Sequence, residues 1–314
     1  MQIVYGMENY KPGEQNLFLA LGNFDGVHKG HQRLINSAIV RKNEVGGVAG
    51  AFIFDPHPAQ ILIPDRMPRL LVNAQRKAEL LKKIGLDLLI YEKFTREIAA
   101  LTPDQFVLDI LLKRLNIKEV FVGFNHSFGY KGLGTPQLLQ MLGEEHGFKV
   151  HIMPPVKVDE EIVSSSLIRQ ALEQGRIARA AKMLGYRPIL DGVVIEGEHR
   201  GRQLGFPTAN IGIDIIYNVP AKGVYAALAR VNERCYSAVV NIGSKPTFHE
   251  EYPISIEAHL MDFNGDIYGQ AISLAFIEKL RNEQRFASLD ELVAQINKDR
   301  DQAYEMAQDE DWEM

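Results

Sequence analysis

The sequence is poor in several features that mark particular classes of protein. It contains one cysteine, Cys235, which excludes an internal disulfide framework and a cysteine-rich zinc site. No apolar run approaches the ~20 residues that a membrane-spanning helix requires, and the N-terminal residues lack the pattern of a signal peptide. Lys and Arg total 35 against 40 Asp and Glu, a net charge of −5, so the basic excess of a non-specific nucleic-acid binder is missing. We therefore expect a cytoplasmic protein with no membrane or nucleic-acid partner.

What is present is ordinary for a folded globular chain. Of 314 residues, 46% are apolar and 24% are charged. At ~150 residues per domain, this length suggests two domains. The pattern of the sequence changes near residues 183–188. We predict one domain over 1–185, a second over 186–307 and an acidic tail over 308–314.

In the first domain, short apolar runs alternate with segments of helical period. Strands that alternate with helices predict a parallel sheet with helices on its faces. The buried strand at 17–21 ends at Gly22, and a further strand at 48–54 ends at an Asp-Pro pair. The other expected elements are helices at 32–45, 73–85, 102–116 and 135–147 and strands at 86–94, 119–124 and 149–156.

The second half has a different pattern. Residues 164–186 are predicted to be helical with a break near Gly175. Short strands with Gly-rich turns follow, and their alternation is typical of antiparallel strands with one buried face. Their even spacing favours a small barrel, and 288–307 is predicted to close the chain as an amphipathic helix. The expected strands are 189–198, 222–232, 235–243, 254–263 and 270–280.

The loop between the first strand and the first helix carries the clearest chemistry. Its glycines let the backbone approach a ligand, and the free N–H groups at a helix start favour phosphate. His28 and His31 lie three residues apart at this start, where imidazoles can stabilise charge that develops in a transition state. The alternatives are a Gly-rich turn with incidental histidines and a zinc site that lacks a convincing third ligand. The candidate nucleotide-binding residues are Gly22, Asn23, Phe24, Asp25, Gly26 and Gly30.

The stretch GNFDGVHKGHQ resembles the HxGH nucleotidyltransferase superfamily, and within it the FAD synthetase domain of the bacterial riboflavin kinase/FMN adenylyltransferase family. FDPHP at 54–58 resembles that family's second strand-end motif. VSSSLIRQAL at 163–172 resembles its SSTxIR signature, with Ser where Thr is usual. The resemblance implies a Rossmann-like domain in which Ser164, Ser165 and Arg169 bind ATP phosphates. Hydroxyls and a guanidinium suit phosphate oxygens.

One segment departs from the family pattern VGxDFxFG. Here it reads VGFNHSFG over 122–129, so Asn125 replaces Asp and His126 replaces an aromatic residue. Asn125 can still donate to or accept from a flavin or its ribityl phosphate, although it brings no negative charge. The departure leaves room for an altered substrate preference or weak adenylylation.

The second half contains a phosphate-binding pattern of another kind. No GxxxxGK[ST] motif occurs, so a P-loop is not indicated. The stretch 197–210 combines glycines, arginines and an FPTAN segment between strand-like runs. Thr208 and Asn210 offer two oxygen ligands that point the same way on an extended backbone. A hard cation such as Mg²⁺ takes such oxygens with water and nucleotide phosphates; the alternative is an ordinary Gly-Pro loop.

GRQLGFPTANI resembles the riboflavin kinase signature, and later segments follow in the order of that family. The resemblance implies a six-stranded antiparallel barrel with a C-terminal helix. It also implies that Thr208 and Asn210 coordinate Mg²⁺–ATP and that Glu257 is the general base for the riboflavin 5′-hydroxyl. Arg281 is a candidate contact for the flavin or the product phosphate. The candidate nucleotide-binding residues are Gly201, Arg202, Gly205 and Pro207.

The resemblance covers about residues 15 to 305 and implies a bifunctional enzyme. Its C-terminal domain converts riboflavin and ATP to FMN, and its N-terminal domain converts FMN and ATP to FAD and pyrophosphate. Three alternatives stay open: a kinase with an inactive transferase domain, a flavin- or nucleotide-binding regulator, and a different HxGH transferase such as a cytidylyltransferase. We expect riboflavin, FMN and ATP as substrates and a monomer or weak homo-oligomer.

Overall fold

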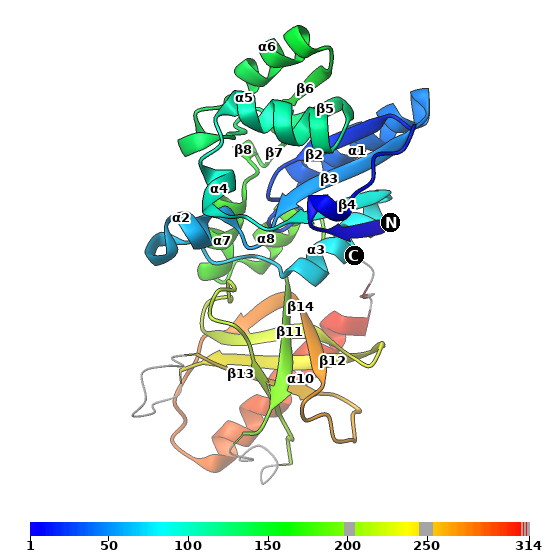
Figure 1. Ribbon diagram of the computed structural model, residues 1–314. Helices are drawn as coiled ribbons and strands as arrows, with labels where there is room; N and C mark the ends of the chain where they lie inside the picture. Colours follow the sequence, from blue (N-terminus) through cyan, green and yellow to red (C-terminus); the bar gives the residue numbers. More distant parts are fainter. Residues whose placement is uncertain (198–204, 245–253, 309, 311, 313–314) are drawn as a thin grey trace. The chain divides into compact units, whose positions relative to one another are not determined.

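The computed structural model describes residues 1–197, 205–244, 254–308, 310 and 312. The chain forms two compact units (Figure 1). The first comprises Met1–Pro68 and Ala74–Ser164, and the second comprises Arg69–Asn73 and Ser165–Met314. No helix among the described residues is long and apolar enough to cross a membrane.

The first unit contains a six-stranded sheet in the order β1-β4-β3-β2-β5-β6, and every neighbouring pair is parallel. This confirms the predicted fold class. The edge strand β1 was not predicted, because Gln2–Tyr5 is short and three of its four residues are exposed. The strands are β1 (Gln2–Tyr5), β2 (Leu17–Leu21), β3 (Val48–Phe54), β4 (Leu88–Glu92), β5 (Ile117–Gly123) and β6 (Lys149–Met153).

The core of this unit lies on both faces of the central strand β2, all five residues of which are buried. Leu17, Leu19 and Leu21 belong to one apolar cluster with the helices that follow β4 and β5. The opposite face is covered by α1, which packs on β2, β3 and β5. Burial on both faces explains the unbroken apolar run. The helical segments are α1 (Lys29–Val45), α2 (Pro58–Leu62), α3 (Ala74–Ile84), α4 (Arg96–Ala99), α5 (Pro103–Gln105), the π-helical η3 (Phe106–Arg114) and α6 (Pro136–His146), with short 3-10 turns at η1 (Met7–Asn9), η2 (Pro64–Arg66) and η4 (Tyr130–Gly132). A small hairpin, β7 (Lys157–Val158) and β8 (Glu161–Ile162), completes the unit.

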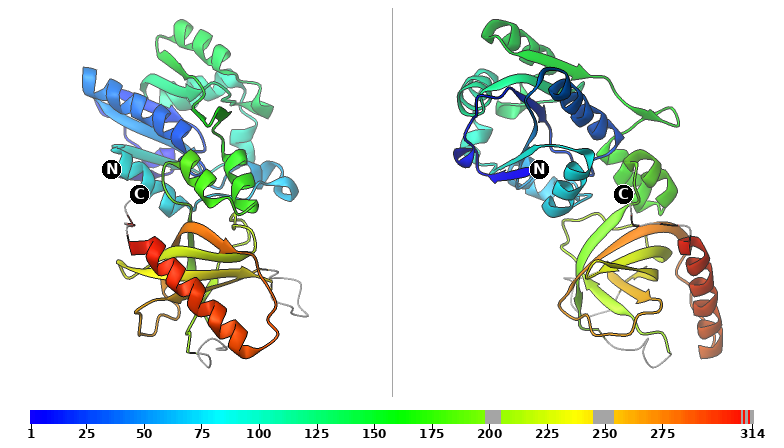
Figure 2. Two further views of the ribbon diagram at one scale, coloured as in Figure 1. Left: turned by 180° about the vertical axis from the view of Figure 1, so that it is seen from behind. Right: turned by 90° about the vertical axis from the view of Figure 1, so that its right-hand side faces the viewer.

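The second unit is a closed barrel in the order β10-β13-β12-β11-β14-β9, with antiparallel pairs throughout. The predicted antiparallel barrel is therefore confirmed. α10 lies along the outside of the barrel against β11, β12 and β14 (Figure 2). The elements are α7 (Ser165–Glu173), α8 (Ile177–Leu184), β9 (Ile189–Ile195), β10 (Ala209–Gly212), β11 (Gly223–Val231), β12 (Arg234–Gly243), β13 (Ser255–Leu260), β14 (Ala271–Arg281) and α10 (Leu289–Gln308).

Two segments pack with the second unit although they precede the predicted boundary at 185. The first is the pair α7 and α8, which break at Gly175 as expected, where φ is +70°. The Ala221 N–H donates to the Leu172 carbonyl at 2.9 Å, and α8 packs on β14. The second is Arg69–Asn73, where the Leu70 N–H donates to the Ile216 carbonyl at 2.7 Å. Packing therefore divides the chain at Ser164, while the functional boundary at 185/186 stays a prediction.

Candidate functional sites

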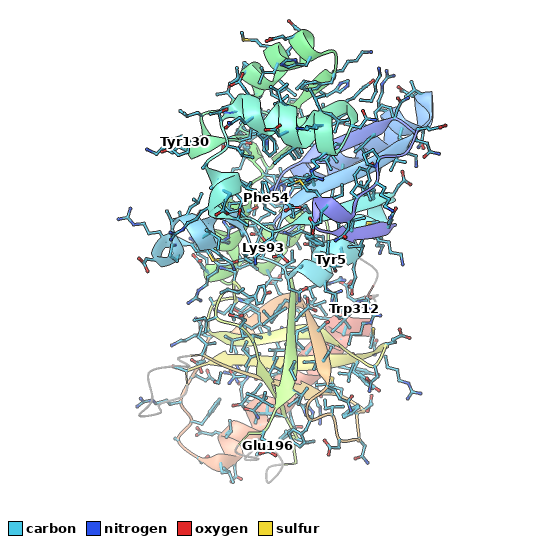
Figure 3. The ribbon with its side chains drawn as sticks, in the orientation of Figure 1. Tyr5, Phe54, Lys93, Tyr130, Glu196 and Trp312 are labelled. Atoms are coloured by element: carbon cyan, nitrogen blue, oxygen red, sulfur yellow. The ribbon has the colours of Figure 1, made fainter. Side chains whose placement is uncertain are left out.

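The loop between β2 and α1 is held in a strained conformation. Because neighbouring strands are parallel, β2, β3 and β5 end at one edge of the sheet, where ligands bind in such folds. Figure 3 labels Phe54, the last residue of β3, at this edge. Phe24 and Val27 have φ values of +47° and +37°, which are unfavourable for residues other than glycine. Both are buried, at 1% and 0% exposure, so the core holds the turn in place.

The two predicted histidines lie face to face at the start of α1. His28 is the N-cap, and its Nδ1 accepts from the His31 N–H at 3.3 Å. The two rings stack with centroids 3.5 Å apart, and the Phe24 ring meets His31 edge-on at 5.3 Å. Because the two histidines are three residues apart in the sequence, their imidazoles lie side by side at the N-terminus of α1, where the sequence predicted a helix start.

The surroundings of His31 act on its charge. Burial lowers its pKa well below the ordinary value, and the neighbouring His28 and Lys77 lower it further. Its Nδ1 is buried and has no hydrogen-bond partner among the described residues. Burial and the two neighbouring groups therefore favour the neutral form of His31. The sequence had left the charge of these imidazoles open.

The FDPHP segment meets the same loop from β3. His57 Nε2 lies 3.2 Å from the side-chain amide nitrogen of Asn23, and His57 Nδ1 accepts from the Ala59 N–H at 3.1 Å. Lys77 on α3 donates to the Asn23 main-chain carbonyl at 2.8 Å. The sequence did not point to Lys77, because it stands in a helical segment with several other lysines and has no motif around it. Asp25, another predicted residue of the loop, is buried at 3% exposure.

Residues 125–127, where the sequence differs from the family pattern, follow β5 at the same edge of the sheet. Asn125 is exposed and available to a ligand. The His126 ring stacks on Phe128 with centroids 6.0 Å apart, and burial lowers its pKa to about 4. A neutral, stacked imidazole can substitute for the aromatic residue of the family pattern, so the local packing is kept. A role for Asn125 toward the flavin stays a prediction.

The serine-rich segment begins α7. Ser165 is the first residue of the helix, and Arg169 lies one turn later on the same face. Arg169 Nε donates to the main-chain carbonyl of Arg69 at 2.6 Å, which orients the guanidinium. ATP contacts of Ser164, Ser165 and Arg169 stay predictions.

In the second unit, three polar residues lie in one row across neighbouring strands. Glu257 on β13 is in register with Asn210 on β10 and with Asn241 on β12. Directly opposed residues share a face of the sheet, with Cβ atoms about 4.5–5.5 Å apart. Ile256 and Ala258, on the other face, are 3% and 0% exposed, whereas Glu257 is half-buried. The predicted base and one predicted metal ligand are thus neighbours, although 47 residues separate them (257 − 210).

The donor set suits a magnesium ion that also carries nucleotide phosphates. Thr208 lies two residues before Asn210, so its hydroxyl reaches the same side of an extended backbone. The part of the chain that the structure describes has no group of three His, Cys, Asp or Glu that could enclose a metal. Mg²⁺ does not need one, because it keeps several waters and uses substrate phosphates. A Cβ atom at Gly197 would overlap the Asn210 amide, so this glycine makes room for it.

The FPTAN segment is fixed by a histidine that the sequence did not single out. His259 Nδ1 lies 2.8 Å from the Pro207 carbonyl, and the Phe206 ring meets the His259 ring edge-on at 5.7 Å. His259 is two residues after Glu257 on the same strand face. Gly205 precedes the FPTAN segment and has a φ of +83°. The strand β9 ends at Ile195, and the residue that follows it, Glu196, is labelled in Figure 3. Gly201 and Arg202 lie outside the described residues.

Arg281 has a structural partner. Its Nε and Nη2 donate to the carboxylate of Asp299 on α10 at 2.9 and 2.8 Å, and Asp299 is 3% exposed. Gln295 donates to the same carboxylate at 2.8 Å. The observed contacts join β14 to α10, while the predicted flavin contact of Arg281 stays a prediction.

The comparisons with known proteins match both halves of the chain. Residues 11–167 match the family model described as FAD synthetase, and residues 184–307 match that of riboflavin kinase. The bifunctional riboflavin kinase/FMN adenylyltransferase of Bacillus subtilis is 39% identical over 290 residues, which cover 91% of this chain and 90% of the relative. Its counterpart in Escherichia coli K12 is 36% identical over 301 residues, covering 95% and 96%.

A solved structure extends the match to the fold. The chain is similar to a protein of Streptococcus pneumoniae described as a macrolide-efflux protein, with a TM-score of 0.86 and 29% identity. The match covers 96% of this chain and 98% of the other. It contains both units, so the two-unit architecture is common to the two proteins.

The fold and the two sites define a class, the two-part transferases that act on nucleotides through a parallel-sheet unit and an antiparallel barrel. Both family models and the coverage of the relatives narrow that class. The chain belongs to the bifunctional riboflavin kinase/FMN adenylyltransferase family.

Proposed function

We propose that the two activities are divided between the two units, with the barrel phosphorylating riboflavin and the parallel-sheet unit adenylylating FMN. The chain is a bifunctional enzyme of flavin biosynthesis with riboflavin kinase and FMN adenylyltransferase activities, which produce FMN and FAD. The observation that supports the division is that each unit has its own pair of adjacent candidate site residues. These are His28 with His31 in the first unit and Glu257 with Asn210 in the second.

In the kinase step, Glu257 accepts the proton of the riboflavin 5′-hydroxyl. The oxygen attacks the γ-phosphorus of ATP, the bond from that phosphorus to the bridging oxygen breaks, and ADP leaves with FMN as product. Thr208 and Asn210 would hold Mg²⁺, which when bound neutralises charge on the phosphates. Because Asn210 opposes Glu257 across the ladder, a phosphate bound to a metal ion at Asn210 would lie on the same face of the sheet as the base.

In the adenylyl step, an oxygen of the FMN phosphate attacks the α-phosphorus of ATP. The bond from the α-phosphorus to the β-phosphate oxygen breaks, and pyrophosphate leaves with FAD as the other product. Negative charge then grows on the leaving group. The imidazoles of His28 and His31, beside the free N–H groups of the α1 N-terminus, donate to those oxygens and stabilise that charge.

A chromatographic assay tests the proposal with the full chain. We expect FMN and then FAD from riboflavin, ATP and Mg²⁺, and FAD from FMN, ATP and Mg²⁺. FMN without FAD in the second reaction would contradict the adenylyl half and favour a kinase with an inactive transferase domain. Flavin binding without consumption of ATP would favour a regulator. CTP in place of ATP tests the cytidylyltransferase alternative.

Two expectations, on the cellular location and on the oligomeric state, belong to the same proposal. An enzyme that consumes ATP and makes flavin cofactors is placed in the cytoplasm, which cell fractionation tests. A monomer or weak homo-oligomer is expected, and light scattering after size-exclusion chromatography gives the mass against 35.4 kDa per chain.

A further inference from the structure

One lysine of α3 turns toward the loop that carries the histidine pair. Lys77 Nζ donates to the main-chain carbonyl of Asn23 at 2.8 Å. Lys82 and Lys83, near the end of the same helix, are exposed. Lys77 is half-buried, and a lysine that is drawn partly out of solvent usually has a partner for its charge. The position of Lys77 therefore calls for an explanation beyond solvation of the helix.

Two carboxylates face this ammonium group. Burial lowers the pKa of Lys77, whereas Asp25, in the loop after β2, and Asp55, in the loop after β3, raise it. These carboxylates favour the charged form of Lys77. The cation is thus placed where the first two motif loops meet.

The contact with Asn23 joins three segments of the first unit. The main chain of Asn23 accepts from Lys77 on α3, and its side chain contacts His57 in the FDPHP segment. Asn23 lies next to Phe24, whose ring packs on His31. A displacement of Asn23 would therefore move Phe24, and Phe24 would move the histidine pair.

We propose that Lys77 is a positioning residue for adenylyl transfer, which holds the 22–31 loop through the Asn23 carbonyl and places a positive charge behind His31. This inference rests on the proposed function of the first unit. Lys77 does not contact substrate in this role. It fixes the direction of the loop N–H groups, and its charge disfavours protonation of His31, so that the imidazole acts as a neutral donor toward the leaving pyrophosphate.

The electrostatic surroundings of His31 make this role measurable. The groups that face it are His28 on α1 and Lys77 on α3, and Asp25 and Asp55 face Lys77 in turn. With Lys77 neutralised, the pKa of His31 should rise toward its ordinary value. An acid limb of FAD formation that reports protonation of His31 should then move to higher pH, because His31 takes up its proton more readily.

The experiment uses the full-length enzyme with Lys77→Met, Lys77→Arg and the matched control Lys83→Met on the same helix. For Lys77→Met we expect the kcat of FAD formation to fall about 10- to 100-fold, the effect of losing a charge-assisted hydrogen bond. The KM for ATP should change by less than about threefold, because the contact acts through the loop and not on the nucleotide. Lys77→Arg should recover most of the loss, and Lys83→Met should match the unmodified enzyme. FMN formation by the barrel reports that each variant is folded.

A second measurement does not depend on turnover. The His31 ring signal, followed by NMR against pH and assigned with His31→Gln, should titrate below the ordinary histidine pKa in the unmodified protein and higher in Lys77→Met. An unchanged His31 titration in folded Lys77→Met would overturn the proposal, as would a Lys77→Arg enzyme no better than Lys77→Met. If the unmodified enzyme makes no FAD, the proposed function fails instead, and the NMR titration still tests the contact.

Discussion

At the scale of the residue, the proposed kinase site depends on how a carboxylate is placed. Glu257 alternates with two buried residues and is opposed by asparagines on both neighbouring strands. Such a carboxylate has an amide side chain directly opposite it on each neighbouring strand. It is suited to accept a proton and to remain close to a metal-bound phosphate.

Glu257→Gln should lower the kcat of FMN formation by about 10²- to 10⁴-fold, the usual contribution of a general base. The substitution keeps the shape and removes the proton acceptor, so riboflavin binding should change little. Conversion of FMN to FAD should be unaffected. Glu305→Gln, at an exposed position of α10, is the control. A kinase that keeps more than a tenth of its rate would exclude Glu257 as the base.

His259 should act on nucleotide affinity and not on proton transfer. Its Nδ1 donates to the Pro207 carbonyl, and either charge state of the ring can keep that hydrogen. His259→Ala removes one hydrogen bond worth about 0.5–1.5 kcal/mol, which corresponds to a KM for ATP raised up to about tenfold in the kinase reaction. His259→Asn, which can donate from its amide, should recover part of this. An altered kcat with unchanged KM would contradict the assignment.

At the scale of the element, a buried ion pair joins α10 to the barrel. Asp299 is 4% exposed at its side chain and Arg281 is 19% exposed, and the guanidinium binds both carboxylate oxygens. Small residues close the contact, since Ala303 is fully buried against Ala226 and Met261. The pair sets the position of α10 on the outer face of the barrel.

Asp299→Ala should lower the free energy of unfolding by about 3 kcal/mol, because removing one partner leaves a desolvated charge. The double substitution Arg281→Met with Asp299→Leu should cost less than the single one, since no charge is then left unpaired. Urea denaturation of the three proteins measures both effects. Equal losses in the single and double variants would show that the ion pair is not the important contact.

The strands β2 and β3 and the segment Arg69–Asn73 show what sequence reasoning can and cannot reach at this scale. The strands β2 and β3 were predictable, because parallel strands buried on both faces give continuous apolar runs. The segment Arg69–Asn73 was not, because its packing on residues 216–218 depends on a main-chain contact between positions far apart in the chain. Sequence patterns reveal elements through their periodicity, and a segment of five residues such as Arg69–Asn73 is too short to have one.

At the scale of the whole molecule, the two reactions should be separable by substitution. His28→Ala should reduce FAD formation from FMN by at least about 10²-fold, as expected when a donor to a transition-state charge is removed. FMN formation from riboflavin should be unchanged, since no residue of the barrel site is altered. His28→Ala should therefore lose FAD formation and keep FMN formation, whereas Glu257→Gln should lose FMN formation and keep FAD formation. Loss of both activities in His28→Ala would contradict separate sites.

The sequence alone determined the class of fold and the order of the two units, and it supplied the hypothesis for the chemistry of each motif. It could do so because buried strands, amphipathic helices and glycine-rich loops have local signatures, and because both motifs are continuous in the chain. Only the tertiary structure decided that His31 is in surroundings that lower its pKa, that Glu257 opposes Asn210, that Arg281 pairs with Asp299, and that Lys77 reaches the 22–31 loop. Burial, strand register and charge pairing arise between residues that are distant in sequence, so no local pattern can specify them.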